Sequence, residues 1–143
     1  TWKRQSLRTG QTIPLRQWKL LYRSQSLPRG KKSGIDRLGV GKTFLCRHII
    51  KYLCGEDVKV VSPTFNLLQI YPTKNFEIYH FDLYRLEHLE EIYELGIEEA
   101  FSGNHVCLIE WPEIISSILP PNTISIKISI NSDNNRLVSI YKI

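Results

Sequence analysis

The chain has 143 residues, of which 42% are hydrophobic and 23% charged, as is ordinary for one globular domain. It contains no apolar run near the ~20 residues that a membrane-spanning helix needs, and no signal-peptide-like segment. We therefore expect no association with a membrane. Its three cysteines, Cys46, Cys54 and Cys107, lack metal-ligand spacing. We expect them to be reduced, packed thiols in a cytoplasmic protein.

Charge divides the chain into two segments. Residues 1–38 carry ten lysines or arginines against one acid, Asp36, whereas residues 39–143 carry nine lysines or arginines against thirteen acids. The first segment is therefore near +9 and the second near −4. Such a contrast is typical of segments under different constraints. We predict an atypical basic N-terminal segment over 1–37 and a folded domain over 38–143.

The basic segment contains one helix-like pattern. A short helix is predicted after Pro14, because apolar side chains recur there at helical spacing: Leu15, Trp18, Leu21 and Tyr22. Residues 28–38 contain no apolar run, so the buried strand that normally precedes a phosphate-binding turn is predicted to be missing. Each of its buried residues would contribute ~1.5–3 kcal/mol to a total stability of only ~5–15 kcal/mol. We therefore expect a marginal domain with weakened nucleotide affinity.

From residue 39 onward, helix and strand patterns alternate, which predicts an α/β fold. Helices are predicted over 43–53, 89–101 and 112–119, and strands over 58–61, 66–71, 76–82, 106–109, 123–130 and 136–143. The runs 66–71 and 76–82 are separated by a Pro-Thr-Lys-Asn turn, so we expect an antiparallel hairpin. The run 106–109 is apolar throughout and is expected to be central and buried.

A glycine turn that opens into a helix is the first chemical motif, Gly39-Val40-Gly41-Lys42-Thr43. Backbone N–H groups of such a turn can bind phosphate, and the helix N-terminus adds partial positive charge. Lys42 would reach the β- and γ-phosphates of ATP, and the Thr43 hydroxyl would hold Mg²⁺. The match to the full pattern is partial, because Asp36 stands at its first glycine. A turn with a solvated lysine is the alternative.

Two acids follow predicted strands. Asp82 ends the run that begins at Phe76, and Glu110 follows the apolar run 106–109. An acid in such a place can hold Mg²⁺, as we expect for Asp82. A second acid can orient or deprotonate the attacking water, as we expect for Glu110. Either acid alone is more often a loop or capping residue, but together with the glycine turn they predict a P-loop NTPase-like mixed sheet flanked by helices.

Further side chains could complete the site, and each has a structural alternative. Thr64 lies on a turn stiffened by Pro63 and could close on Mg²⁺ and the γ-phosphate, or merely stabilise the turn. Trp111 could stack on a base or pack in the core. We expect Arg85 to form a surface ion pair and His80 to be structural.

Five sequence blocks, in order, closely resemble the TsaE (YjeE) family over about residues 38–143: Leu38-Gly-Val-Gly-Lys-Thr43, Ser62-Pro-Thr-Phe65, His80-Phe-Asp-Leu-Tyr-Arg-Leu86, Glu90-Glu91 with Glu94-Leu-Gly96, and Ile109-Glu-Trp-Pro-Glu113. The resemblance implies a small bacterial ATPase of tRNA threonylcarbamoyladenosine synthesis. It also implies TsaB- and TsaD-like partners, which install threonylcarbamoyl on adenosine 37 of tRNA. Contact with tRNA would be indirect, through that complex.

The resemblance also implies roles for single residues. The turn 39–43 matches the family's phosphate and Mg²⁺ ligands. Thr64 matches the threonine that senses the γ-phosphate, and Asp82 matches the Mg²⁺-linked acid. Glu110 matches the catalytic or water-orienting acid, and Trp111 matches the aromatic residue beside the nucleotide.

The chain departs from the family pattern near its glycine turn. Asp36 and Arg37 replace a Gly-Asp pair, and Phe44 replaces a second threonine. Residues 1–37 match nothing in the family, and three explanations are open: a disrupted reading frame, a targeting extension and an RNA-contacting basic arm. Two other functions are open as well, a small P-loop kinase and a degenerate, non-catalytic partner-binding remnant.

Overall fold

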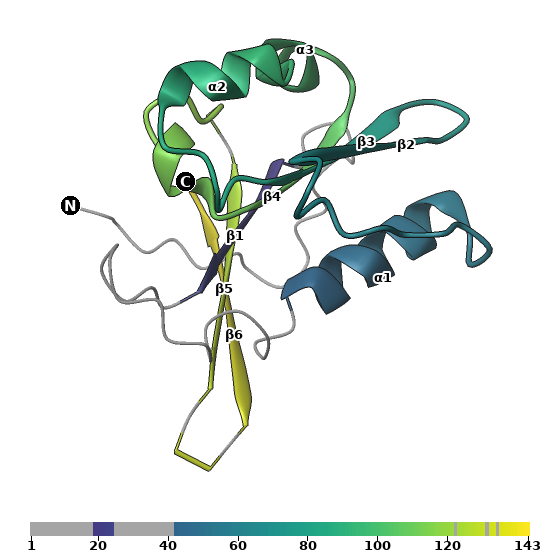
Figure 1. The fold of residues 1–143 in the computed structure, drawn as a ribbon. Coiled ribbons are helices and arrows are strands. Elements are labelled where there is room, and N and C mark those ends of the chain that lie inside the picture. Colours follow the sequence, from purple (N-terminus) through teal and green to yellow (C-terminus); the bar gives the residue numbers. More distant parts are fainter. Residues whose placement is uncertain (1–18, 25–41, 122, 131, 134) are drawn as a thin grey trace.

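The computed structural model describes residues 19–24, 42–121, 123–130, 132–133 and 135–143 (Figure 1). Three residues predicted to bind phosphate, Gly39, Val40 and Gly41, lie outside this part of the chain. In the described residues no helix is long and apolar enough to cross a membrane.

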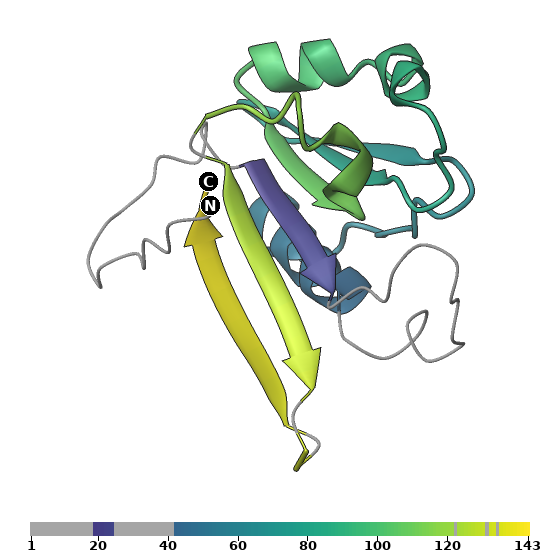
Figure 2. The same cartoon turned by 90° about the vertical axis from the view of Figure 1, so that its left-hand side faces the viewer.

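A six-stranded mixed sheet forms the centre of the fold, in the order β2-β3-β4-β1-β5-β6 (Figures 1 and 2). The strands are β1 Lys19–Ser24, β2 Leu68–Pro72, β3 Glu77–Asp82, β4 Val106–Glu110, β5 Ile124–Ile130 and β6 Arg136–Lys142. β3, β4, β1 and β5 run parallel, whereas β2 and β6 pair antiparallel at the two edges. The predicted mixed sheet is therefore confirmed.

β1 changes the interpretation of the basic segment, because it forms a strand where the pattern predicted part of a helix. It pairs in parallel with β4 on one side and with β5 on the other. The expected helix through Leu21 and Tyr22 was therefore wrong, and so was the expected lack of a strand before the glycine turn. A short apolar run fits the helical period as well as the strand period. Hydrogen bonding to two neighbouring strands favours the strand here. The basic segment is thus unusual in composition but still contributes a strand. The predicted marginal stability rested on a missing strand, so the structure removes the reason for that prediction.

Three helices cover the two faces of the sheet (Figure 1). α1 Lys42–Cys54 lies on one face, and α2 Leu89–Glu94 and α3 Ile97–Ser102 lie on the other. We predicted one helix over 89–101, but the chain breaks at Gly96, whose φ of 79° is left-handed. Only glycine adopts this conformation without steric cost, so two short helices replace the long one.

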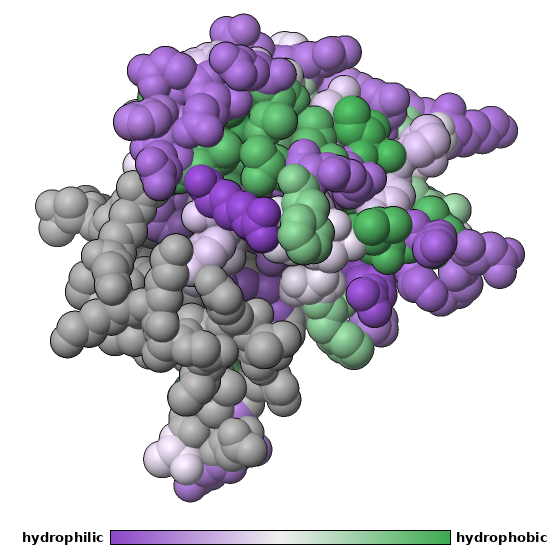
Figure 3. All heavy atoms as spheres, viewed as in Figure 1, coloured by the Kyte–Doolittle hydropathy of each residue, from purple (hydrophilic) through white to green (hydrophobic). Residues whose placement is uncertain are grey.

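Strand alternation builds a separate core on each face, because successive side chains of a strand point to opposite sides. The α1 face buries side chains of β3, β4 and β5 against Cys46 and Ile50 of the helix. The strand side chains include Ile78, Val106, Leu108 and Ile126. The other face buries Tyr79, Phe81, Cys107 and Ile109 against Ile92, Ile97 and Ala100. The outer surface of α2 and α3 is hydrophilic (Figure 3), and the acids Glu90, Glu94, Glu98 and Glu99 are exposed.

Several other predicted elements are confirmed. β2 and β3 form the expected antiparallel hairpin. β4 lies inside the sheet with all five residues buried. β5 and β6 are the two expected C-terminal strands, and they pair antiparallel. All three cysteines are free thiols, and Cys46 and Cys107 are buried, as expected of packed side chains.

Two local predictions were wrong. Residues 58–61 do not form a strand; instead the Val61 N–H donates to the Tyr71 hydroxyl at 3.0 Å, and that hydroxyl donates to the Val61 carbonyl at 3.1 Å. A side chain thus satisfies backbone groups that we assigned to a strand partner. The helix expected over 112–119 is a single 3-10 turn, η2 Pro112–Ile115.

Candidate active site

The polar end of the α1 face is built by β3 and β4. These strands are parallel, and their register places Asp82 opposite Glu110 and His80 opposite Leu108. Because alternate residues share a face, His80, Asp82 and Glu110 continue the apolar α1 face with polar groups at its end. α1 begins beside them with Lys42 and Thr43. The fold therefore brings the predicted acids and the start of the predicted phosphate-binding helix to one place.

Hydroxyl groups from two other segments meet these carboxylates. Thr43 Oγ1 donates to Glu110 Oε2 at 3.5 Å, and Thr64 Oγ1 donates to Asp82 Oδ2 at 3.3 Å. Thr64 is in turn 2.7 Å from the hydroxyl of Ser62. The residues that we predicted to hold Mg²⁺, Thr43 and Asp82, thus share one cluster with Thr64 and Glu110.

The pKa of Asp82 reflects its burial and its polar neighbours. Burial raises the pKa of the Asp82 carboxyl, and the nearby charge of Glu110 raises it further. Hydrogen bonds from the Tyr84 N–H, at 3.1 Å, and from Thr64 lower that pKa, but they only partly offset the rise. A cation between the two carboxylates would favour their charged forms. Carboxylate and hydroxyl oxygens are also the donors that Mg²⁺ prefers, so these residues fit that ion.

Lys42 and Trp111 contact each other at the edge of the cluster. Lys42 Nζ lies 3.7 Å from the centroid of the Trp111 ring, a cation–π contact. Tyr84 packs on the same ring at 4.9 Å between centroids. Trp111 holds a left-handed backbone with φ of 58°, which costs ~1–3 kcal/mol in a bulky residue and is common at functional sites. Trp111 is thus held beside the lysine predicted to bind phosphate.

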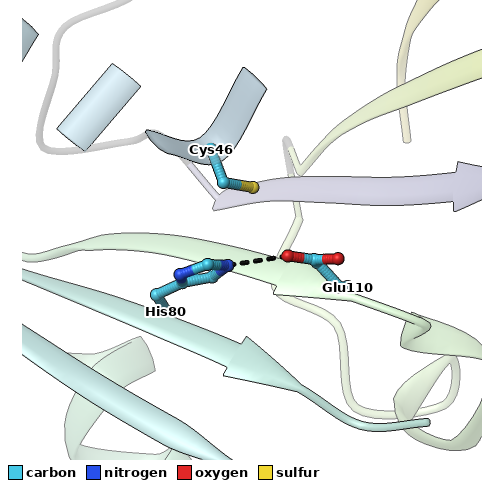
Figure 4. A group of neighbouring side chains, drawn as sticks. All are labelled: Cys46, His80 and Glu110. Carbon is cyan, nitrogen blue, oxygen red and sulfur yellow. Dashed lines mark hydrogen bonds and ion pairs between the residues drawn. The ribbon is translucent and has the colours of Figure 1, made fainter. Parts of the chain in front are cut away.

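His80 was expected to be structural, and the structure gives it a defined contact with the site. Its ring is fully buried, and Nε2 lies 2.9 Å from Glu110 Oε1 (Figure 4). Because a carboxylate only accepts hydrogen bonds, Nε2 donates. His80 and Thr43 therefore hold one oxygen each of Glu110. The sequence carried a signal for this contact, since His80 lies two residues before Asp82 on a strand and shares its face.

The remaining side chains near the site are Cys46 and Arg85. Cys46 projects from α1 toward His80 and Glu110 (Figure 4). Burial raises the pKa of its thiol well above the ordinary value, and Glu110 and Asp82 raise it further. We expected a surface ion pair for Arg85, but within the described residues its guanidinium lies 4.9 Å from the ring centroid of the exposed Phe65.

Comparison with known proteins gives consistent relatives. The family model described as "Threonylcarbamoyl adenosine biosynthesis protein TsaE" matches residues 35–138. Two proteins named tRNA threonylcarbamoyladenosine biosynthesis protein TsaE are similar. The one from Rickettsia typhi is 58% identical over 105 residues, which are 73% of this chain and 72% of that protein. The one from Bacillus subtilis is 36% identical over 102 residues, 71% of this chain and 63% of that protein.

A solved structure shows the same fold. The crystal structure of Bacillus subtilis YdiB superposes with a TM-score of 0.60 at 24% sequence identity. The match covers 90% of this chain and 73% of the YdiB chain. The likeness confirms a mixed α/β, P-loop NTPase-like fold.

Proposed function

Because the chain belongs to the TsaE family, we propose that it binds and hydrolyses ATP in support of the threonylcarbamoylation of adenosine 37 in tRNA. TsaB- and TsaD-like proteins would be its partners, tRNA would be reached through their complex, and the cytoplasm would be its location. The observation that carries the enzymatic part is the convergence of Thr43, Asp82 and Glu110. These residues come from a helix and two strands, and their chemistry suits a Mg²⁺-nucleotide.

Binding would use the start of α1 and the end of β3. Thr43 and Asp82 would hold Mg²⁺, while Lys42 and the turn 39–43 would hold the phosphates. Bound Mg²⁺–ATP supplies a γ-phosphoryl group whose charge is partly neutralised by the metal. Thr64 donates to Asp82 in the present structure. Its hydroxyl would therefore respond to changes on the Mg²⁺ and γ-phosphate side, as a switch threonine does.

Glu110 would act on the attacking water. His80 fixes its Oε1, and its Oε2 lies beside the Thr43 hydroxyl. These two contacts keep the carboxylate in a constant orientation, and a shift of the Thr43 hydroxyl to Mg²⁺ would free Oε2 to orient a water molecule or accept its proton. Burial of Glu110 to 4% exposure strengthens this effect, because charges interact more strongly away from bulk solvent.

Lys42 and Trp111 would form the nucleotide side of the site. The lysine now lies over the indole ring, and phosphate oxygens would compete with the ring for its charge. Trp111 would then lie beside the bound nucleotide, where its ring could stack on the base.

ATP turnover in the presence of the purified partner proteins tests this proposal. Glu110→Gln keeps the size of the side chain but removes its basicity, and we expect turnover to fall ~10²–10⁴-fold. Glu113→Gln is the matched control, since this acid lies three residues further on, in η2. Equal turnover in the wild type and in Glu110→Gln would contradict the catalytic role.

A second candidate function is a non-catalytic, partner-binding remnant. Phe44 favours it, because the family pattern has a hydroxyl here, whereas the Phe44 ring is 65% exposed and packs on His48 at 4.1 Å. Such a protein would bind the partner complex with no release of phosphate from ATP. A small P-loop kinase would instead transfer the γ-phosphoryl group to an acceptor molecule. Release of free phosphate with no acceptor present therefore indicates an ATPase and not a kinase.

A further inference from the structure

Three buried side chains with different ligand atoms meet beneath the start of α1. Cys46 comes from the second turn of α1, His80 from β3 and Glu110 from the end of β4 (Figure 4). One ligand atom of each, a sulfur, a ring nitrogen and a carboxylate oxygen, lies within 4.8 Å of the other two. All three side chains are buried. Linear spacing could not reveal this group, because its members come from three separate elements.

The group is close to the geometry of a tetrahedral metal site. Metal–ligand bonds of ~2.0–2.3 Å place the sulfur, nitrogen and oxygen atoms of a tetrahedral Zn²⁺ site ~3.4–3.6 Å from each other. The three atoms lie within 4.8 Å of one another, so the separations need a contraction of at most ~1.2–1.4 Å, while the 2.9 Å contact between His80 and Glu110 opens slightly. His80 Nδ1 has no hydrogen-bond partner among the described residues, so no second hydrogen bond opposes a turn of the ring.

The ligand types separate this group from the predicted Mg²⁺ site. Thiolate and imidazole select zinc and similar ions, whereas Mg²⁺ prefers oxygen ligands such as Thr43 and Asp82. Three protein ligands with an open fourth position are typical of zinc sites that exchange a bound water or substrate. Binding would displace the thiol proton of Cys46, because the thiolate is the metal ligand.

We propose that Cys46, His80 and Glu110 form a site for one thiophilic divalent cation such as Zn²⁺, and that its occupation inhibits ATP hydrolysis. The inhibitory part rests on the proposed function, since Glu110 is the residue expected to act on water. An ion that holds Glu110 takes its carboxylate away from that water and replaces its contact with His80. The two metal sites are neighbours, because Glu110 of the zinc site lies opposite Asp82 of the Mg²⁺ site. Zinc would therefore hold the carboxylate that productive Mg²⁺–ATP needs for the attacking water.

Cobalt substitution tests the metal site without reference to activity. Co²⁺ bound to a thiolate gives a charge-transfer absorption, and we expect one equivalent of Co²⁺ to produce it in the wild-type chain. Zn²⁺ should displace the signal. Cys46→Ala should abolish it and weaken Zn²⁺ binding at least ~100-fold, since even the loss of an outer-shell partner costs ~10–100-fold. Cys54→Ser is the matched control, because Cys54 lies on the same helix but outside the group, and its spectrum should equal that of the wild type.

The signal's absence from folded wild-type protein, or its persistence in Cys46→Ala, would overturn the site. If Cys46→Ala fails to fold, Cys46→Ser replaces the sulfur with a smaller, harder ligand, and circular dichroism checks the fold. Inhibition is then measured as the ratio of ATP turnover with and without Zn²⁺ in excess Mg²⁺. A fall of at least ~10-fold in the wild type and under twofold in the Cys46 variant supports the proposal, and equal falls refute the inhibitory link. A wild type that hydrolyses no ATP before Zn²⁺ is added would refute the proposed function alone, because the Co²⁺ spectrum still decides the site.

Discussion

Replacement of His80 by phenylalanine tests the contact that orients Glu110. The imidazole is fully buried, and Glu110 is only 4% exposed. His80→Phe keeps a flat ring in the same space but removes the Nε2–H that reaches Glu110 Oε1 at 2.9 Å. Glu110 then keeps only the long 3.5 Å contact with Thr43 among the hydrogen bonds described for its side chain.

The expected cost follows from this geometry. A hydrogen bond to a charged group contributes ~1.5–3 kcal/mol, and an acid left buried without a partner adds its own desolvation penalty. We therefore expect His80→Phe to lower the free energy of unfolding by about 3 kcal/mol. For a chain of this length, a loss of that size lowers the melting temperature by ~6–12 °C. It is also a large share of a typical stability of ~5–15 kcal/mol.

Urea denaturation of four proteins separates the hydrogen bond from simple repacking. The set is the wild type, His80→Phe, Glu110→Leu and the double variant, and their free energies of unfolding give the coupling between the two side chains. We expect a coupling of at least ~1.5 kcal/mol. His48→Phe is a control, since that histidine is exposed and its ring nitrogen lies 2.9 Å from the Phe44 carbonyl of its own helix, so the substitution should cost under ~1 kcal/mol. A coupling below ~0.5 kcal/mol would refute an orienting role for His80.

Three further predictions concern other parts of the site and fold. The pKa of Asp82 in the folded protein is raised above its ordinary 3.8. The protonated carboxyl therefore adds to the free energy of unfolding in full below pH 3.8, and this contribution is lost as the pH rises through the folded pKa. Asp82→Asn should therefore stabilise the ligand-free protein at neutral pH by about 1 kcal/mol in thermal denaturation, and a lower melting temperature would contradict this. Trp111→Phe should remove most of the change in tryptophan fluorescence on addition of Mg²⁺–ATP, and an unaltered change would exclude Trp111 as the reporter. Gly96→Ala should cost about 1 kcal/mol in urea denaturation, because its φ is 79° although open space surrounds the added methyl group, whereas Gly96→Asn should cost less; equal stability of all three proteins would show that the turn carries no strain.

The strands that could be predicted were those with unambiguous periods. β4 is apolar up to its last residue, β5 alternates isoleucine with polar residues, and a short polar segment after Pro72 separates β2 from β3. These signals are local, so they do not depend on the rest of the fold. The acids Asp82 and Glu110 could then be placed, because the ends of parallel strands meet at one edge of a sheet.

The wrong predictions share a dependence on distant contacts. β1 is short and its apolar residues fit a helix as well as a strand, so only pairing with β4 and β5 decides its structure. Residues 58–61 have strand-like side chains, but the Tyr71 hydroxyl satisfies backbone groups of Val61. The position of Gly96 inside an acidic, apolar pattern hid the break between α2 and α3.

The site shows the same limit. Asp82 and Glu110 became candidates from their place after strands, but the contacts of His80, Cys46 and Trp111 depend on how the elements pack. His80 was within reach of the sequence, since strand alternation puts it on the face of Asp82. Cys46 was not, because its neighbours lie on other elements.

Binding of Mn²⁺ together with ATP tests the central claim most directly. Mn²⁺ replaces Mg²⁺ at oxygen sites, and electron paramagnetic resonance counts the bound ion without need of turnover. We expect one ATP-dependent Mn²⁺ per wild-type chain, with affinity at least ~10-fold lower in Asp82→Asn and in Thr43→Ala and unchanged in Asp57→Asn, an exposed acid after α1. Equal Mn²⁺ affinity in all four proteins would contradict a nucleotide–metal site at the start of α1.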